Sequence, residues 1–277
     1  MRAREALDVA VAELAEAGCP SPRVDAEWLL AEALSVSRSE LQVDGTRELS
    51  PEIAEGFRRA IARRAAREPL AYILGEWGFR QLELCVDSRV LIPRPETEVL
   101  VERSLALLAG IDRPRVLDVG VGSGAVALAI AEEHAGAHVV ATDRSADALA
   151  VAEENRARVG LDGRIDLVEG ELFAGVAGPF DLVVSNPPYV DSDDLDTLDP
   201  EVRDYEPREA LVATGVTEAI AAGAPEVLVA GGALALEVAD GKAAEIAALL
   251  ENGGYEGVTV TRDLAGRERI VDGRTHR

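Results

Sequence analysis

The residues best suited to chemistry lie in one short run, Ser185-Asn186-Pro187-Pro188-Tyr189. Two consecutive prolines fix φ and carry no N–H, so the backbone is rigid and its carbonyls are available as acceptors. The side-chain oxygen of Asn186 and the carbonyl of Pro187 can accept the two hydrogens of an –NH2 group, while Tyr189 offers a wall for a planar substrate. The run predicts substrate binding by Asn186, Pro187, Pro188 and Tyr189, with Asn186, Pro187 and Tyr189 as catalytic residues.

The chemistry that this run favours is transfer of a group to a planar amide or amine nitrogen. Holding both hydrogens aims the nitrogen lone pair at an electrophile for in-line displacement. An amide nitrogen is a poor nucleophile because its lone pair is delocalised, and two acceptors stabilise the positive charge that builds as it becomes pyramidal. No general base is obligatory, since the proton can leave after transfer. The run alone does not distinguish the amide of glutamine from the amine of adenine.

A glycine-rich loop upstream predicts the second substrate. Gly120, Val121, Gly122, Ser123 and Gly124 stand between a predicted strand and a predicted helix, an arrangement that brings backbone close to a nucleotide-like ligand. The residue after the loop is an alanine, where a dinucleotide fingerprint needs its third glycine, which disfavours NAD and FAD. The acidic residue before the loop, Asp118, suits a ligand with a positive ammonium group better than one with a pyrophosphate.

Two further positions complete the predicted cofactor site. Asp143 ends the next predicted strand, where a carboxylate can accept hydrogen bonds from both ribose hydroxyls. Glu171 and Leu172 follow the third predicted strand, at the position where contacts to adenine would fall. Together with the loop, these residues predict S-adenosylmethionine as the methyl donor, without a metal.

The elements that must position these residues alternate between strand and helix patterns. Alternation of this kind builds an α/β fold with a mostly parallel sheet covered on both faces. The two last strands have no helix between them, which predicts an antiparallel edge pair. The predicted strands are 115–119, 138–142, 165–168, 180–185, 233–238, 258–261 and 268–271, and the predicted helices are 125–133, 146–159, 216–229 and 243–251.

The N-terminal part has a different pattern. Apolar residues recur at helical spacing through the first ~85 residues, with a third helix expected over 51–67. Residues ~70–93 combine aromatic and β-branched residues with two glycines, which predicts a short hairpin or linker. The helix over 51–67 carries a cluster of arginines that is either a solvated face or a docking surface for an acidic partner: Arg58, Arg59, Arg63, Arg64 and Arg67.

Composition excludes several classes of protein. With 28 Lys and Arg against 51 Asp and Glu among 277 residues, the formal net charge is −23. Such a surface repels a phosphate backbone, so direct binding of nucleic acid is not expected. The two cysteines have no metal or redox spacing, which favours the reducing cytoplasm. No stretch approaches 18 uncharged apolar residues, so no membrane span is expected.

With these motifs in place, the chain resembles the release-factor glutamine methyltransferases (the PrmC/HemK family). The resemblance covers nearly the whole chain, and its most diagnostic segment is Leu91-Ile92-Pro93-Arg94-Pro95-Glu96-Thr97-Glu98. The segments 69–75, 205–207 and 263–269 complete the pattern. Three positions depart from it: Val121 stands where threonine is common, Leu172 where some members have tryptophan, and 215–218 differ in a turn.

The resemblance implies a class I methyltransferase fold, which is Rossmann-like with a seven-stranded, mostly parallel sheet and an antiparallel last strand. It implies a helical docking domain over 1–70, a hairpin linker over 71–93 and a methyltransferase domain over 94–277. Asn186 would contact both cofactor and substrate. The implied reaction is methylation of N5 of the glutamine in the Gly-Gly-Gln motif of class 1 peptide chain release factors, which modulates translation termination. We expect a cytoplasmic monomer.

Two alternatives remain at this point. The first is an N6-adenine methyltransferase acting on DNA or RNA, because a flipped adenine amine fits the same two acceptors and can stack on Tyr189. The acidic charge argues against it, since a duplex usually needs a basic footprint. The second is a protein that binds S-adenosylmethionine as a sensor or scaffold, in which the Asn-Pro-Pro-Tyr run would be idle.

Overall fold

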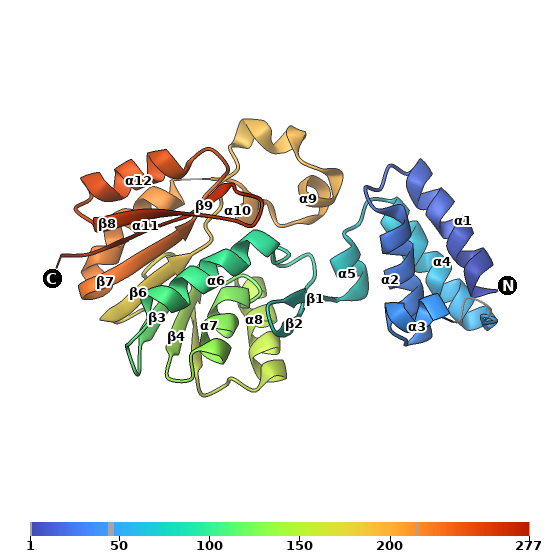
Figure 1. The fold of residues 1–277 in the computed structure, drawn as a ribbon, viewed down its shortest axis with the longest axis horizontal. Helices are drawn as coiled ribbons and strands as arrows, with labels where there is room; N and C mark the ends of the chain where they lie inside the picture. Colours follow the sequence, from blue (N-terminus) through green and yellow to red (C-terminus); the bar gives the residue numbers. More distant parts are fainter. Residues whose placement is uncertain (1, 44–46, 214, 277) are drawn as a thin grey trace. The chain divides into compact units, whose positions relative to one another are not determined.

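The computed structural model describes residues 2–43, 47–213 and 215–276. The chain forms two compact units, drawn together in Figure 1. Unit 1 comprises Met1–Glu76 and Asp199–Tyr205, and unit 2 comprises Trp77–Leu198 and Glu206–Arg277. These boundaries differ from the predicted ranges in two ways. The linker predicted over 71–93 is divided, with 71–76 in unit 1 and 77–93 in unit 2, and a short segment from the second half of the chain belongs to unit 1.

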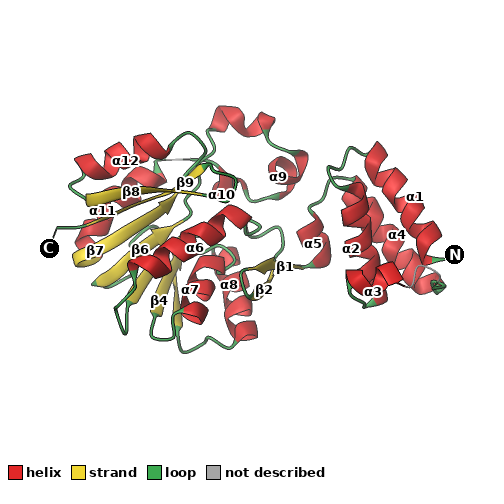
Figure 2. Ribbon diagram, viewed as in Figure 1, coloured by secondary structure: helices red, strands yellow, loops and turns green. Residues whose placement is uncertain are grey.

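Unit 2 is built on a seven-stranded sheet with the order β5-β4-β3-β6-β7-β9-β8 (Figure 2). The strands β3 to β7 are parallel, and β9 pairs antiparallel with both β7 and β8. The predicted fold class is confirmed, including the antiparallel last strand. The strands are β3 (Arg115–Val119), β4 (His138–Asp143), β5 (Ile165–Glu169), β6 (Phe180–Ser185), β7 (Leu228–Glu237), β8 (Glu256–Arg262) and β9 (Glu268–Arg274).

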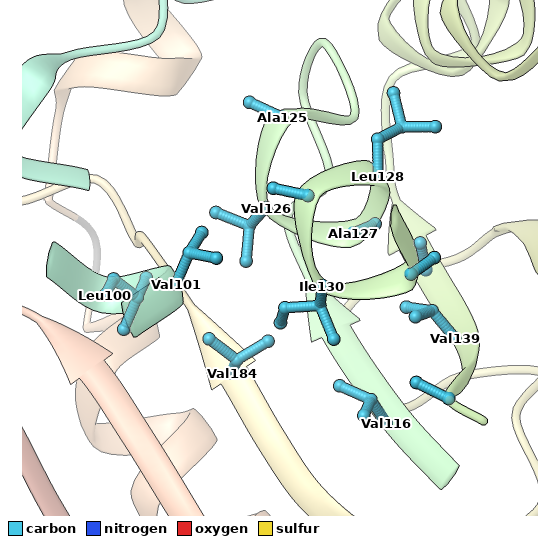
Figure 3. Packing of buried hydrophobic residues seen from close by; sticks show 14 of the residues in the cluster. Leu100, Val101, Val116, Ala125, Val126, Ala127, Leu128, Ile130, Val139 and Val184 are labelled. Carbon is cyan, nitrogen blue, oxygen red and sulfur yellow. The ribbon is translucent and has the colours of Figure 1, made fainter. Parts of the chain in front are cut away.

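Helices cover both faces of this sheet because its strands are apolar on both sides. In β3, Val116 packs in one buried cluster and Leu117 in the other. Figure 3 shows side chains of α6 and α7 lying over Val116, Val139 and Val184 of the strands. The first face is covered by α6 (Pro95–Leu107), α7 (Ala125–Glu133) and α8 (Ala146–Val159), and the second by α11 (Val216–Val227) and α12 (Ala243–Asn252).

Several elements depart from the sequence prediction. The hairpin is present as β1 (Glu76–Phe79) and β2 (Leu82–Cys85), but residues 70–74 before it form a helix, α5 (Leu70–Leu74). The helix α6 was not predicted, since proline and acidic residues at its start carry no apolar period. The predicted strand over 233–238 is longer, and the short helices that follow the Asn-Pro-Pro-Tyr run were missed: η1 (Ser192–Thr197), α9 (Pro200–Tyr205) and α10 (Arg208–Leu211).

Unit 1 is helical, with a core of mostly leucines and alanines, together with Phe57 and Ile61, between its helices. The predicted third helix is the fourth, because the short α3 was missed, and it ends at Ala65 rather than Arg67. Ser50 caps its N-terminus by accepting from the Ile53 N–H at 3.3 Å. The helices of residues 3–65 are α1 (Ala3–Glu16), α2 (Pro22–Leu34), α3 (Arg38–Val43) and α4 (Pro51–Ala65). Within the described ranges, no helix of the chain is long and apolar enough to cross a membrane.

A buried ion cluster joins α9 to the N-terminal helices within unit 1. Arg64, 4% exposed, donates from Nε to Asp25 at 2.8 Å and from Nη2 to Glu201 at 2.8 Å. Arg67 donates to both oxygens of Glu201, at 2.8 and 2.5 Å. The hydroxyl of Tyr205 donates to the Ala66 carbonyl at 2.7 Å. Thus a helix that begins eleven residues after Tyr189 in sequence is held by ion pairs to the N-terminal helices.

The arginine cluster predicted on the helix over 51–67 is therefore divided between different partners. Arg64 and Arg67 are used inside unit 1, and Arg63 is paired with Glu68. Arg58 and Arg59 are exposed, and both lie beside Glu55. A docking surface built from all five arginines is wrong, because two of them serve the interior of the unit.

Replacing Glu201 by alanine is expected to destabilise unit 1 by about 2 kcal/mol. Removing one partner of a buried pair costs about 3–5 kcal/mol, and we discount this because the Arg67 side of the cluster is partly open to water. Since Trp28 lies in unit 1 and Trp77 in unit 2, urea unfolding followed by tryptophan fluorescence in a Trp77→Phe background reports unit 1. Glu55→Ala, at a half-exposed residue of α4, is the control, and equal midpoints for the two variants would contradict the expectation.

Candidate active site

One pocket of unit 2 brings together the two predicted runs. It lies at the carboxyl ends of β3, β4 and β6, the edge where ligands bind in open α/β sheets. Its walls come from the glycine loop, from the ends of β4 and β5, from the Asn-Pro-Pro run and from the segment before α6. The predicted site residues that line it are Gly120, Val121, Gly122, Ser123, Asp143, Glu171, Leu172, Asn186, Pro187 and Pro188.

The glycine loop adopts a conformation that side chains resist. Gly120, Gly122 and Gly124 have φ of 82°, 52° and 88°, in the left-handed region that favours glycine. The N–H groups of Gly120 and Val121 both donate to the Thr142 carbonyl, at 2.8 and 2.9 Å, which anchors the loop to β4. Gly124 lies outside the pocket lining, and a Cβ on it would meet Leu128 at 2.9 Å. Its role is close packing at the start of α7.

Asp143 connects the loop to the next strand. Its Oδ2 accepts from the Gly122 N–H at 3.0 Å, and its Oδ1 accepts from the Ser145 N–H at 2.9 Å. Each carboxylate oxygen can accept a second hydrogen bond, so both remain able to bind a ligand hydroxyl. The carboxylate is thereby fixed in place, with each of its oxygens anchored by one backbone N–H.

Asp118 is a buried carboxyl of the pocket wall whose capacity for hydrogen bonding is only partly used. It is 2% exposed, and burial raises the pKa of its carboxyl to about 7, with the Asp143 charge adding to the rise. The Ala127 N–H opposes this by hydrogen bonding to the carboxyl. Among the described residues, Oδ2 has no hydrogen-bond partner. A buried carboxylate in this state favours a cationic ligand group beside it.

The third wall is built around Leu172. Its φ is 55°, an unusual value for a leucine, and its carbonyl accepts from the Thr142 hydroxyl at 3.0 Å. The side chain packs at the margin of the buried cluster of the second face. Glu171 is exposed beside it. The apolar side chain of Leu172 can pack on the face of a flat ring, and the exposed carboxylate of Glu171 can accept a hydrogen bond from the edge of that ring.

The Asn-Pro-Pro-Tyr run leaves β6 beside the glycine loop. The Ser185 hydroxyl donates to the Val119 carbonyl at 2.6 Å, which ties the ends of β6 and β3 together. The Asn186 Nδ2 donates to the Thr97 Oγ1 at 3.2 Å. Tyr189 is half-buried but is not among the residues that line the pocket in the described chain. Burial raises the pKa of its phenol, so the hydroxyl stays neutral.

Sequence reasoning missed the side chain that holds the hairpin to the glycine loop. Asn155 on α8 is fully buried, accepts from the Cys85 N–H at 2.6 Å, and donates to the carbonyls of Cys85 and Ser123 at 3.0 and 2.8 Å. A buried asparagine that satisfies three backbone groups fixes their relative positions. A lone asparagine in a predicted helix gives no sequence signal for this role.

The diagnostic segments that are far apart in sequence meet beside the pocket. Arg94 donates from Nη2 to both oxygens of the buried Glu206, at 2.6 and 2.7 Å. Arg267 donates to Glu96 at 2.6 Å and to Asp263 at 2.9 Å. The diagnostic segment, which leads into the first turn of α6, is therefore held from two sides: Arg94 by the 205–207 segment, and Glu96 by the turn between β8 and β9. The spacing of these motifs gave no sign that they pair.

Comparison with known proteins is consistent with this arrangement. Residues 5–75 match the family model described as PrmC N-terminal domain, and residues 96–199 match the one described as Methyltransferase small domain. The chain is similar to the 16S rRNA methyltransferase RsmC of T. thermophilus, with a TM-score of 0.54 and 17% identity over 73% of this chain and 50% of that one. That likeness concerns the fold. The sheet order and the glycine loop define a class I S-adenosylmethionine-dependent methyltransferase.

Two relatives identify the family to which the chain belongs within this class of methyltransferases. The release factor glutamine methyltransferase of Deinococcus radiodurans is 44% identical over 99% of both chains. That of Geobacter sulfurreducens is 42% identical, over 98% of this chain and 96% of the relative. The chain belongs to the release factor glutamine methyltransferase family.

Proposed function

We propose that this enzyme transfers the methyl group of S-adenosylmethionine to the side-chain amide nitrogen of the glutamine in the Gly-Gly-Gln motif of class 1 peptide chain release factors. The observation that carries the proposal is the single pocket in which the glycine loop and the Asn-Pro-Pro run face the same space. Asn186 and the Pro187 carbonyl, which can accept the two hydrogens of an amide, form an amide clamp. A cofactor loop beside this clamp indicates that a group is transferred from the cofactor to the amide nitrogen. The named activity of the relatives supports the same substrate.

The residues of the pocket fit the proposed cofactor. Asp143 would accept from the ribose hydroxyls, Leu172 and Glu171 would flank the adenine, and the glycine loop would lie along the nucleoside. The unpartnered oxygen of Asp118 fits the ammonium of the amino-acid end, whose charge compensates for the burial of the carboxylate. When bound, S-adenosylmethionine supplies an electrophilic methyl group on a sulfonium, so no metal is required.

Cofactor affinity is expected to fall below pH 7 because of Asp118. Its pKa is raised to about 7, so at lower pH an ammonium group must displace a proton from the carboxyl before pairing with it. Affinity should therefore fall by up to about tenfold per pH unit as the pH drops below 7, and be highest where Asp118 is ionised and the ligand's α-ammonium group still carries its proton. Isothermal titration calorimetry across this range measures the effect. Asp118→Asn should flatten the profile, and a wild-type affinity independent of pH between about 5.5 and 7 would contradict this role.

The clamp would act on the substrate through groups of this chain alone. The Nδ2 of Asn186 is engaged by Thr97, which leaves Oδ1 to accept one hydrogen of the glutamine amide. The carbonyl of Pro187 would accept the other, and Tyr189 would support the amide plane. Because both hydrogens are held, positive charge on the nitrogen is stabilised as it becomes pyramidal. The surplus proton then leaves to water.

Unit 1 is proposed to dock the protein substrate. A glutamine on a folded partner must be presented in one orientation, and contacts remote from the reacting atoms supply that positioning. Two exposed arginines of α4, Arg58 and Arg59, provide basic side chains for such contacts. We propose a cytoplasmic monomer that binds no nucleic acid directly.

Incubation with labelled S-adenosylmethionine and three substrates tests the function. A release factor, duplex DNA and rRNA are offered separately, and peptide mapping by mass spectrometry locates the added methyl group. The expected result is one methyl group on the Gly-Gly-Gln peptide only. Labelled adenine would instead establish the nucleic-acid alternative, and cofactor binding without transfer to any of the three would favour a sensor.

A further inference from the structure

A chain of three polar side chains lies behind the amide clamp in unit 2. Thr97 stands in the first turn of α6 and is 4% exposed, while Glu237 ends β7 and is 2% exposed. The Thr97 Oγ1 accepts from the Asn186 Nδ2 at 3.2 Å. The Thr97 hydroxyl also lies close enough to the Glu237 carboxyl that hydrogen bonding from it lowers the pKa of that group. The second carboxyl oxygen, Oε2, finds no hydrogen-bond partner within the described ranges.

The direction of these bonds follows from what each group can do. A carboxylate can only accept, so with Glu237 ionised the hydroxyl hydrogen of Thr97 points to it. The Thr97 Oγ1 can then only accept a hydrogen bond from Asn186. Because an amide has one donor end and one acceptor end, Nδ2 must face Thr97 and Oδ1 must face the pocket.

We propose that Thr97 and Glu237 are positioning residues that fix the orientation of the Asn186 amide, so that its oxygen, and not its –NH2 group, meets the substrate nitrogen. This inference rests on the proposed function of Asn186. It assigns to the diagnostic segment 91–98, which runs into the first turn of α6, a task beyond packing. The wrong orientation would place two –NH2 groups face to face and leave the clamp without its side-chain acceptor.

Protonation of Glu237 would release this constraint. Burial raises the pKa of its carboxyl to about 7, and the Thr97 hydrogen bond works against the rise. Arg269 on β9 and Arg94 before α6 lower the pKa, whereas Glu96 on α6 raises it; Tyr189, after β6, also faces the group.

A protonated Glu237 can donate to the Thr97 Oγ1, which frees the threonine hydrogen to bond with the Asn186 oxygen. The Asn186 amide can then rotate into the opposite orientation. Since transfer requires the ionised form, kcat should fall as the pH drops below about 7.

Three variants test the proposal in the full-length enzyme with a release factor as substrate. Thr97→Val keeps the shape but removes the acceptor, and kcat should fall about tenfold, the equivalent of one lost hydrogen bond. Thr97→Ser keeps the hydroxyl and should recover most of that loss. Glu237→Gln cannot titrate, so the fall of kcat at acid pH should disappear, with a lower plateau because a glutamine can also donate. Saturating S-adenosylmethionine removes any contribution from Asp118.

Each variant's affinity for S-adenosylmethionine and its melting temperature separate positioning from misfolding. We expect affinity within about twofold of wild type, since the Thr97–Asn186 hydrogen bond is separate from the bonds that anchor the glycine loop and Asp143. Wild-type kcat for Thr97→Val, no recovery in Thr97→Ser, or an unchanged acid limb in Glu237→Gln overturns the proposal. If Thr97→Val does not fold, the other two variants decide it. If the wild-type enzyme methylates adenine and not the release factor, the proposed function fails. The ratio of kcat between each variant and wild type is then measured with the adenine substrate, and the same outcomes decide the proposal.

Discussion

Replacing Asn186 by alanine is expected to lower kcat for methylation of the release factor by about 10²–10³-fold. The variant loses the acceptor that stabilises positive charge on the substrate nitrogen, and one such group is worth about 2.7–4 kcal/mol of transition-state stabilisation. The loss should appear in kcat more than in KM, because an acceptor for the uncharged amide is worth less than one for the charged nitrogen. Single-turnover kinetics with saturating cofactor measures the chemical step directly.

The matched control is Asn252→Ala, an exposed asparagine at the end of α12. It should leave both constants at wild-type values. The Asn186 variant should still bind S-adenosylmethionine, which shows that the fold and the glycine loop are intact. Turnover close to wild type in the Asn186 variant would remove the amide clamp from the mechanism, whichever substrate is used.

Replacing Asp143 by alanine is expected to weaken S-adenosylmethionine binding by about 3 kcal/mol or more, on the order of 10²-fold in the dissociation constant. Hydrogen bonds to a charged group contribute about 1.5–3 kcal/mol each, and two ribose hydroxyls would lose their acceptor. The structure adds a second cause, because Asp143 also holds the Gly122 N–H at 3.0 Å. Loss of that bond loosens the loop that should lie along the nucleoside.

Calorimetry with S-adenosylmethionine measures this loss, and the KM for the release factor should change little. Asp147→Ala is a suitable control, since this aspartate is exposed in the first turn of α8, four residues away. It should cost no more than about 1 kcal/mol through the helix dipole. An unchanged dissociation constant in the Asp143 variant would mean that the ribose is held elsewhere. Asp143→Asn should be intermediate, because it keeps one acceptor.

The sequence was sufficient for the sheet and for most of the pocket wall. Strands such as 115–119 and 180–185 were predicted with the bounds that the structure shows, because a buried parallel strand is a short apolar run with clear ends. Successive parallel strands place their carboxyl ends at one edge, so residues that follow them were bound to lie close together. The placement of Asp143 and Asn186 around one pocket follows from this rule alone.

Prediction was weakest for elements whose start is polar or whose length is short. The helix α6 begins with a proline and two glutamates, and its apolar residues face a sheet that the local sequence does not reveal. The helices α3, α9 and α10 have four to six residues each, too few for a helical period to stand out. For the same reason the assignment of Asp199–Tyr205 to unit 1 could not be seen in the sequence.

The sequence by itself determined which residues can do the chemistry, because the constraints on glycine φ, on consecutive prolines and on strand ends act within a few residues. Only the tertiary structure decided which side chains hold them. Thr97 meets Asn186 across 89 positions, Asn155 meets Cys85 across 70, and Arg64 meets Glu201 across 137. Such pairs depend on how whole helices and strands pack, and a polar side chain carries no local sign of the distant partner that will satisfy it.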